Sequence, residues 1–203
     1  MNQKEPILFK TALCALIIAL SLSWLTAAGP AEQLPENLLR LHVVAASDSQ
    51  ADQALKLKVR DAVLTEAARW CEGAGTLQEA STGICTHLES ITQAAQSTVN
   101  QNGFTDTVTA TVTDEFFPTR SYNGFTLPAG RYRALRVVIG EGSGHNWWCI
   151  VFPALCLPAA QGEDVLSALP PEQRAVVEKQ GVQVSFKLAE LYEELKNWLA
   201  GGA

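Results

Sequence analysis

The sequence is organised around residues 140–158, which read GEGSGHNWWCIVFPALCLP. This stretch holds two of the five tryptophans, two of the five cysteines and one of the three histidines of the chain. Three glycines at its start permit positive backbone φ angles, and the apolar run 147–152 that follows is bounded by Pro153. We expect a glycine-rich turn that leads into a buried strand and then into a tight loop.

The N-terminal residues have the pattern of an export signal. Lys4 and Lys10 precede residues 11–28, which carry no charge and end in small residues. This pattern is typical of a secretory signal peptide or of an uncleaved anchor, and its length is near the shortest that spans a bilayer core of about 30 Å. Both alternatives place the body of the protein outside the cytoplasm. The expected organisation is a signal peptide or N-terminal membrane anchor over residues 1–28, a linker over 29–37, and a single exported α+β domain over 38–200.

The charge of the chain limits its partners. The formal net charge is −6, and it becomes −7 when the single net positive charge of Lys4, Glu5 and Lys10 is removed with the leader. A surface of this sign argues against binding to nucleic acid or adhesion to an anionic membrane face. The exported part is long enough for one domain with a sizeable core, at about 175 residues.

Four cysteines remain beyond the leader, and an even number in an oxidising compartment favours two disulfides. Proximity in sequence favours pairing Cys71 with Cys85 and Cys149 with Cys156, among three possible connectivities. A disulfide closes the second span if the chain doubles back at Pro153. Buried thiols are the alternative for Cys149 and Cys156. Zinc binding is disfavoured because close Cys-x-x-Cys pairs are absent, so neither a metal nor another cofactor is expected.

Hydrophobic periodicity predicts the elements of this domain. Residues 38–46 alternate as a half-buried strand that places His42 at the surface or rim. Ser49 and Asp52 form a capping-box pattern before a helix that runs to about Trp70. The further predicted elements are a second helix over 77–100, antiparallel strands over 105–116 and 132–139, a short helix over 172–180, a strand over 182–186 and a helix over 187–199. They indicate an α+β fold with a small, mostly antiparallel sheet and helices packed on one side, stabilised by disulfides.

Large aromatic side chains gather in residues 117–131, which are too many for a simple hairpin turn. Phe117, Tyr122 and Phe125 surround an Asn-Gly turn and either cap the sheet or touch a partner. Trp147 and Trp148 are adjacent in a strand, so they point to opposite faces and at least one of them packs in the core.

No set of catalytic residues is recognisable. Cys149 and His145 are a nucleophile and a base close in sequence, but on an extended segment they lie about 13 Å apart. Asp48 and Asp52 are explained as a turn residue and a helix cap, and Asp61 as a partner of a basic residue on the helix surface. A thiol-dependent or cell-wall hydrolase is the alternative to a protein without enzymatic activity, and no small-molecule substrate is expected.

Four stretches together resemble the stage II sporulation protein R family. They read LRLHVVAASDSQADQALKLKVRDAVL at 39–64, TVTATVTDEFFPTRSYNGF at 107–125, LPAGRYRALRVVIGEGSGHNWWCIVFPALC at 127–156 and SFKLAELYEEL near the end. The resemblance implies a protein of endospore-forming bacteria that is exported into the space between the forespore and mother-cell membranes. There it would activate a membrane-embedded aspartic protease, stage II sporulation protein GA, which cleaves the precursor of sigma-E.

A protein ligand of this kind needs a rigid scaffold that presents a partly apolar surface. Tryptophan, tyrosine and similar anchors dominate the binding energy of interfaces. The candidates for partner binding are therefore Phe117, Tyr122 and Phe125 in the aromatic loop and His145, Asn146, Trp147 and Trp148 after the glycine turn.

Overall fold

The computed structural model describes residue 14, residues 34–122 and 125–153, and residues 171, 174 and 177. Its elements are a short 3-10 helix η1 (Leu34–Glu36), strand β1 (Leu39–Val44), helices α2 (Gln50–Cys71), α3 (Leu77–Thr86) and α4 (Leu88–Gln101), and strands β2 (Val108–Phe117), β3 (Arg120–Tyr122), β4 (Phe125–Leu127), β5 (Gly130–Ile139) and β6 (Asn146–Phe152). The fold is α+β, as predicted.

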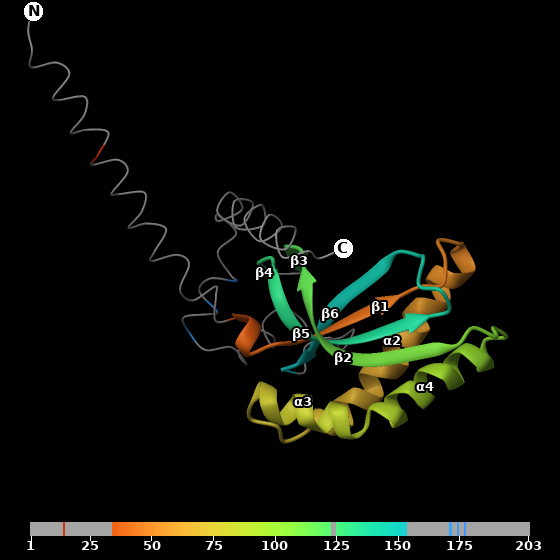
Figure 1. The fold of residues 1–203 in the computed structure, drawn as a ribbon, viewed down its shortest axis with the longest axis horizontal. Coiled ribbons are helices and arrows are strands. Elements are labelled where there is room, and N and C mark those ends of the chain that lie inside the picture. The colour runs from red at the N-terminus through yellow and green to blue at the C-terminus, as the bar shows by residue number, and fades with distance from the viewer. Residues whose placement is uncertain are drawn as a thin grey trace, which may run out of the picture.

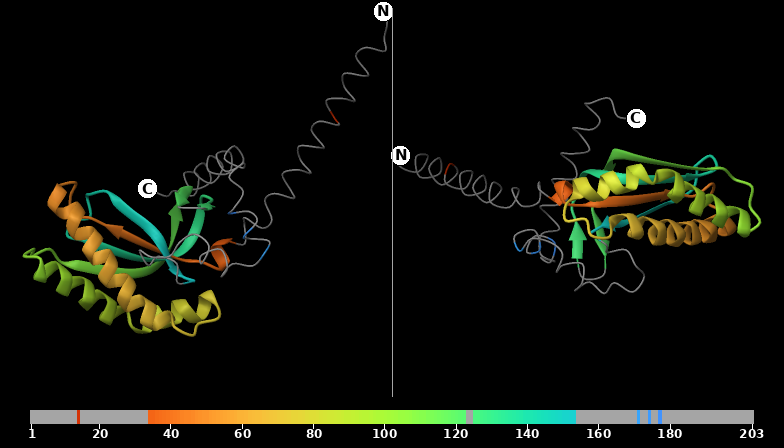
Figure 2. Two further views of the ribbon diagram at one scale, coloured as in Figure 1. Left: turned by 180° about the vertical axis from the view of Figure 1, so that it is seen from behind. Right: turned by 90° about the horizontal axis from the view of Figure 1, so that it is seen from below.

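Four strands form the main sheet in the order β2-β5-β1-β6. The β2–β5 and β1–β6 pairs are antiparallel, while β1 and β5 run parallel. Helices α2, α3 and α4 lie on one side of the sheet (Figures 1 and 2). Strands β3 and β4 pair with each other in a small separate sheet. Part of residues 117–131, which were predicted as an aromatic loop, therefore forms regular structure.

The predicted helix start at Ser49 is confirmed. The Ser49 hydroxyl accepts a hydrogen bond from the backbone N–H of Asp52 at 3.1 Å, which satisfies one of the free donors of the first turn. Helix α2 ends at Cys71, one residue beyond the predicted end, and Gly73 follows with a φ of 77°. Local capping chemistry thus fixes both ends of the longest helix in the described residues.

The single helix predicted over residues 77–100 is wrong, because the chain forms α3 and α4 with a break at His87. The His87 ring stacks on Trp70 of α2 with centroids 3.5 Å apart. Gly83 lies against the same residue, so closely that a Cβ at this position would be 2.3 Å from the Trp70 carbonyl oxygen. The break therefore accommodates a close approach of α3 to the end of α2, which periodicity does not reveal.

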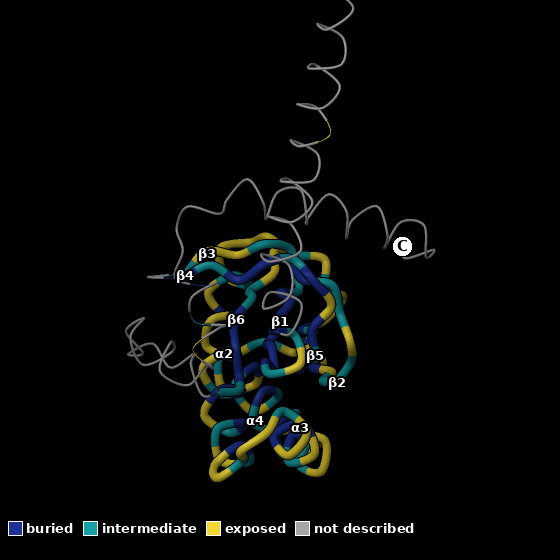
Figure 3. The backbone as a smooth tube through the Cα atoms, turned by 90° about the vertical axis from the view of Figure 1, so that its left-hand side faces the viewer, coloured by how far each residue is buried: buried dark blue, intermediate teal, exposed yellow. Residues whose placement is uncertain are grey.

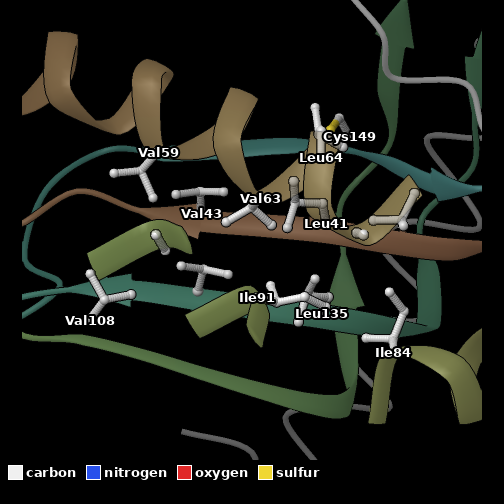
Figure 4. Packing of buried hydrophobic residues seen from close by; sticks show 14 of the residues in the cluster. Leu41, Val43, Val59, Val63, Leu64, Ile84, Ile91, Val108, Leu135 and Cys149 are labelled. Atoms are coloured by element: carbon white, nitrogen blue, oxygen red, sulfur yellow. The ribbon is translucent and has the colours of Figure 1, made fainter. Parts of the chain in front are cut away.

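A hydrophobic core fills the space between the helices and the sheet. Leu41 and Val43 of β1 meet Val59 and Val63 of α2 there (Figure 4). Alternation in the sequence predicts inward side chains for Val108, Ala110 and Val112 of β2 and for Leu135, Val137 and Ile139 of β5. Four of these six are buried in the same cluster, and Ala110 and Val112 pack against it partly buried. Helix residues on the opposite side are exposed, so the helices are amphipathic as packed (Figure 3).

The second face of the sheet is also buried, and the prediction of a half-buried first strand with a rim histidine is wrong. All six residues of β1 are buried, including Arg40 at 0% exposure and His42 at 4%. A second cluster covers this face. It comprises Leu34, Leu38, Phe117, Phe125, Leu127, Tyr132, Ala134, Ile150 and Val177, with Tyr122 and Trp148 partly buried against it.

The predicted disulfide between Cys71 and Cys85 is wrong, because both residues are free thiols. Cys71 packs in the core at the end of α2, whereas Cys85 lies on the exposed side of α3. Cys149 is not a free thiol. Its predicted partner, Cys156, lies outside the described residues, so that pairing stays a prediction.

These two thiols are expected to differ in reactivity. Burial raises the pKa of the Cys71 thiol to about 11, which leaves almost no thiolate at pH 8. Brief iodoacetamide treatment of the native chain at pH 8 should modify Cys85 and spare Cys71, as mapped by peptide mass spectrometry. Denaturation without reductant should then make Cys71 reactive. Protection of both residues until a reductant is added would show that they form a disulfide.

Several predicted elements lie outside the described residues: the leader apart from Cys14, most of the linker, the short helix over 172–180 apart from single residues, the strand over 182–186 and the helix over 187–199. None of the helices in the described part of the chain has the length and apolarity needed to cross a membrane.

Candidate functional site

Two loops meet at one end of the sheet and form a surface that we call the His145 ridge, defined as residues 45–49 and 140–146. Residues 45–49 connect β1 to α2, residues 140–145 connect β5 to β6, and Asn146 is the first residue of β6. The backbone N–H groups of Ser143 and Gly144 donate to the carbonyl oxygens of Ala46 at 3.2 Å and Ala45 at 3.0 Å. Ser143 Oγ donates to the Ala46 carbonyl at 2.6 Å. These bonds hold the two loops together.

The three glycines of the turn are needed for this contact. Gly140 and Gly142 have φ angles of 57° and 64°, in the left-handed region that residues with a Cβ rarely adopt. Gly144 has no such angle, but a Cβ there would lie 2.2 Å from the Ser47 carbonyl oxygen. The glycine spacing that marks the sequence is therefore a packing requirement, and it determines where His145 lies.

His145 is held by Asp48 of the facing loop. The Asp48 carboxylate accepts the backbone N–H of His145 at 2.6 Å and also bonds the ring Nδ1. Hydrogen bonds to His145 lower the pKa of Asp48, so its carboxylate stays ionised at neutral pH. The His145 side chain is nevertheless 78% exposed. Its ring is fixed at the Nδ1 edge and presents the opposite edge at the surface.

A buried lysine of helix α2 stabilises the ridge. Lys56 of α2 is 4% exposed, and its Nζ donates to the His145 carbonyl at 2.8 Å. Burial lowers the pKa of Lys56. The neighbouring Gln53 donates from Nε2 to the Ser47 carbonyl at 2.9 Å. Both loops are thus tied to the first turns of α2, so the ridge is a rigid feature of the surface.

The residues after His145 divide between the surface and the two cores. Asn146 is exposed. Trp147 packs on the helix side and lies 4.4 Å from the Arg60 guanidinium. Trp148 packs on the other side, stacked on His42 with centroids 3.8 Å apart and an interplanar angle of 13°. The prediction that the two tryptophans point to opposite faces is confirmed.

Arg40 lies at the centre of the second buried face, surrounded by aromatic rings. Its guanidinium carbon is 4.2 Å from the centroid of Phe117 and 5.0 Å from that of Tyr132. It donates to the Cys149 carbonyl at 3.1 Å and to the Tyr122 hydroxyl at 2.7 Å. No carboxylate among the described residues pairs with it. Burial lowers the pKa of Arg40, but guanidinium remains charged, and the ring faces compensate for the missing counterion.

His42, two residues along the same strand face, pairs with Glu115 of β2 at 2.7 Å. The Arg40 and His42 contacts were missed by sequence reasoning, which placed these side chains on a solvated face. The sequence feature that could have revealed this burial is the aromatic loop, because its large apolar rings must pack on some part of the protein.

The aromatic loop caps the sheet, which was one of its two interpretations. Phe117 is fully buried, Phe125 is 7% exposed, and Tyr122 stacks on Phe125 with centroids 5.0 Å apart. Buried rings cannot contact a partner without rearrangement. The assignment of these three residues to partner binding stays a prediction, and in this arrangement they act by positioning the hairpin.

The residues considered for catalysis are not brought together. Cys149 is 1% exposed and faces the core beside Leu64 (Figure 4). The His145 ring instead bonds Asp48 at the surface. No group of three or more metal-ligating side chains occurs within the described ranges. The ridge has instead the properties of a contact surface, since it is rigid, polar and exposed.

The profile of the family described as stage II sporulation protein R matches residues 35–161. The chain belongs to this family. Stage II sporulation protein R of Bacillus subtilis (strain 168) is 37% identical over 133 residues, which make up 65% of this chain and 59% of that protein. The match thus spans about three fifths of the relative's length. No solved structure matches the chain significantly.

The match to the stage II sporulation protein R family includes the structural features described above. Residues 35–161 contain strands β1–β6, helices α2–α4, both loops of the His145 ridge and the Arg40 cluster of the described part of the chain. The ridge and the aromatic packing therefore belong to the part of the chain that the family has in common. Membership connects the protein with sporulation.

Proposed function

We propose that the chain is an exported sporulation signalling protein that activates a membrane-embedded aspartic protease, stage II sporulation protein GA. The contact would occur in the space between the forespore and mother-cell membranes and would lead to cleavage of the sigma-E precursor. Family membership supports the role in sporulation. The charged and apolar pattern of residues 1–28 supports export, with the leader either cleaved or kept as an anchor.

The observation that carries the proposal is the fixed, exposed His145. The His145 ring and N–H bond Asp48, the Gly144 N–H before it donates to the Ala45 carbonyl, and the His145 carbonyl accepts from Lys56. A surface that is already ordered loses little conformational entropy on binding. The ridge therefore suits a protein that acts through contact, and Asn146 beside His145 extends the same exposed surface.

The test is co-expression of the full chain with the protease and the sigma precursor in a non-sporulating host. Cleavage of the precursor should depend on this chain. His145→Ala should reduce cleavage at least tenfold, because central interface residues often contribute more than about 1.4 kcal/mol. Glu72→Gln, exposed and outside the ridge at the opposite end of α2, is the control and should keep wild-type cleavage.

Two results would count against the proposal. Equal cleavage with and without the wild-type chain would show that it is not the activator. Wild-type cleavage with His145→Ala would show that the ridge is not part of the contact surface, even if the chain is the activator.

A further inference from the structure

We propose that the open edge of β2 binds an extended segment of another protein as a fifth, antiparallel strand. This inference rests on the proposed function, because it identifies a second surface through which the protein contacts its partner. The edge is the side of β2 that faces away from β5, at the margin of the main sheet (Figures 1 and 3).

The hydrogen bonds of β2 show which backbone groups face outward. The Gly140 N–H donates to the Thr107 carbonyl, so the odd-numbered residues of β2 direct their backbone groups toward β5. The even-numbered residues then point away from the sheet. Two side-chain contacts agree with this assignment: Val108 N–H donates to Gln96 Oε1 at 2.8 Å, and the Asp114 carbonyl accepts from Arg131 at 3.1 Å.

These two contacts cover the ends of the edge and leave its middle open. Between them lie the outward N–H and C=O groups of Ala110 and Val112, for which the described part of the chain supplies no partner strand. The register between β2 and β5 is continuous, without a bulge, and neither proline nor lysine occurs in β2. Bulges, prolines and charged side chains, especially lysine, are the usual protections of an edge strand, and the two charged residues of β2, Asp114 and Glu115, lie beyond the open stretch.

The other edge of the sheet is protected. The pairing of β6 with β1 has a register shift at Leu39 and Arg40. In addition, the carbonyls of Trp148 and Cys149 accept hydrogen bonds from Tyr122 and Arg40, and because successive carbonyls of a strand point to opposite sides, one of these two bonds is made on the outer side of β6. The contrast marks β2 as the edge available for strand addition, a common mode of recognition of extended peptides.

Charge favours a different protein over a second copy as the occupant. The chain has a net charge of −6, so two copies repel each other. Asp114 lies at the end of the open stretch with 63% of its side chain exposed, and its contact with Arg133 is long, at 3.4 Å. The expected occupant is a segment rich in β-branched residues that has a lysine or arginine opposite Asp114 and no other charged residue, since opposite charges stabilise cross-strand pairs.

Ala110→Pro tests the edge in the co-expression assay. Proline removes the outward N–H without breaking a bond to β5, so the chain should fold and resist proteolysis like the wild type. Cleavage of the sigma precursor should fall at least tenfold. Ala110→Ser keeps the N–H and is the matched control, with wild-type cleavage expected. Asp114→Lys independently tests the charge pair proposed opposite Asp114, and it should also reduce cleavage at least tenfold.

The outcomes are separable. No cleavage with the wild-type chain contradicts the proposed function itself. Wild-type cleavage by folded Ala110→Pro overturns the edge proposal, and if that variant does not fold, wild-type cleavage by Asp114→Lys overturns it. Co-precipitation of two differently tagged copies that Ala110→Pro abolishes would assign the edge to self-association, which also overturns it.

Discussion

Replacing Gly144 by alanine is expected to separate the two loops of the His145 ridge. The new Cβ would lie 2.2 Å from the Ser47 carbonyl oxygen, 2.5 Å from its carbon and 3.0 Å from the Ala45 Cβ. Most of these atoms are backbone and cannot move aside as the end of a flexible side chain can. We expect a loss of about 1–3 kcal/mol in the free energy of unfolding, measured by denaturant titration of the full chain.

The same change should reduce cleavage of the sigma precursor at least tenfold, because the next residue is His145. Gly75→Ala is the matched control. Its Cβ would meet only Glu79 Oε2, at an ordinary 3.7 Å, and Gly75 has no positive φ angle. Its free energy of unfolding should stay within about 0.5 kcal/mol of the wild type. Similar losses in the two variants would show that the ridge does not depend on the close approach at Gly144.

The local parts of this fold follow from the sequence. The alternation of Val108, Ala110 and Val112 predicts β2 and its buried side, because side chains of a strand alternate between two faces whatever lies around them. The cap at Ser49 is equally local, since its acceptor and donor lie three residues apart. Both predictions are confirmed. Patterns of this kind need no knowledge of the rest of the chain.

The parts that could not be predicted depend on contacts between distant segments. Arg40 and His42 alternate with apolar residues, and this pattern normally indicates a solvated face. Here the aromatic loop covers that face, so an arginine is buried among Phe117 and Tyr132. The free thiols of Cys71 and Cys85 have a similar cause, because proximity in sequence does not determine which side of a helix faces the core.

The candidate site was found in part. His145 was identified because histidines are rare in this chain, but Asp48 was interpreted as a turn residue. The two residues are 97 positions apart and meet only because β1 and β6 are neighbours in the sheet. The functional meaning of Asp48 therefore depends on the topology, which the local turn pattern does not contain.

Phe117→Ala should produce the largest loss of stability among these variants. Phe117 is fully buried, and its ring contacts Arg40, His42, Tyr132 and Trp148. Removing it leaves a cavity under the hairpin and takes away the nearest ring from a charged guanidinium that has no carboxylate partner among the described residues. Truncation of a buried phenylalanine costs about 3–5 kcal/mol. Denaturant unfolding of the purified chain, followed by circular dichroism, measures this loss.

Phe116→Ala is the control that distinguishes a second core from a general need for aromatic residues. Phe116 precedes Phe117 in β2, points to the opposite face and is only half-buried. Its truncation should cost clearly less. If the two variants lose the same stability, the second face of the sheet is not a packed core. The burial of Arg40 then cannot be explained by the rings around it. A much larger loss for Phe117 would show that the second face of the sheet is a core in its own right, with a positive charge at its centre.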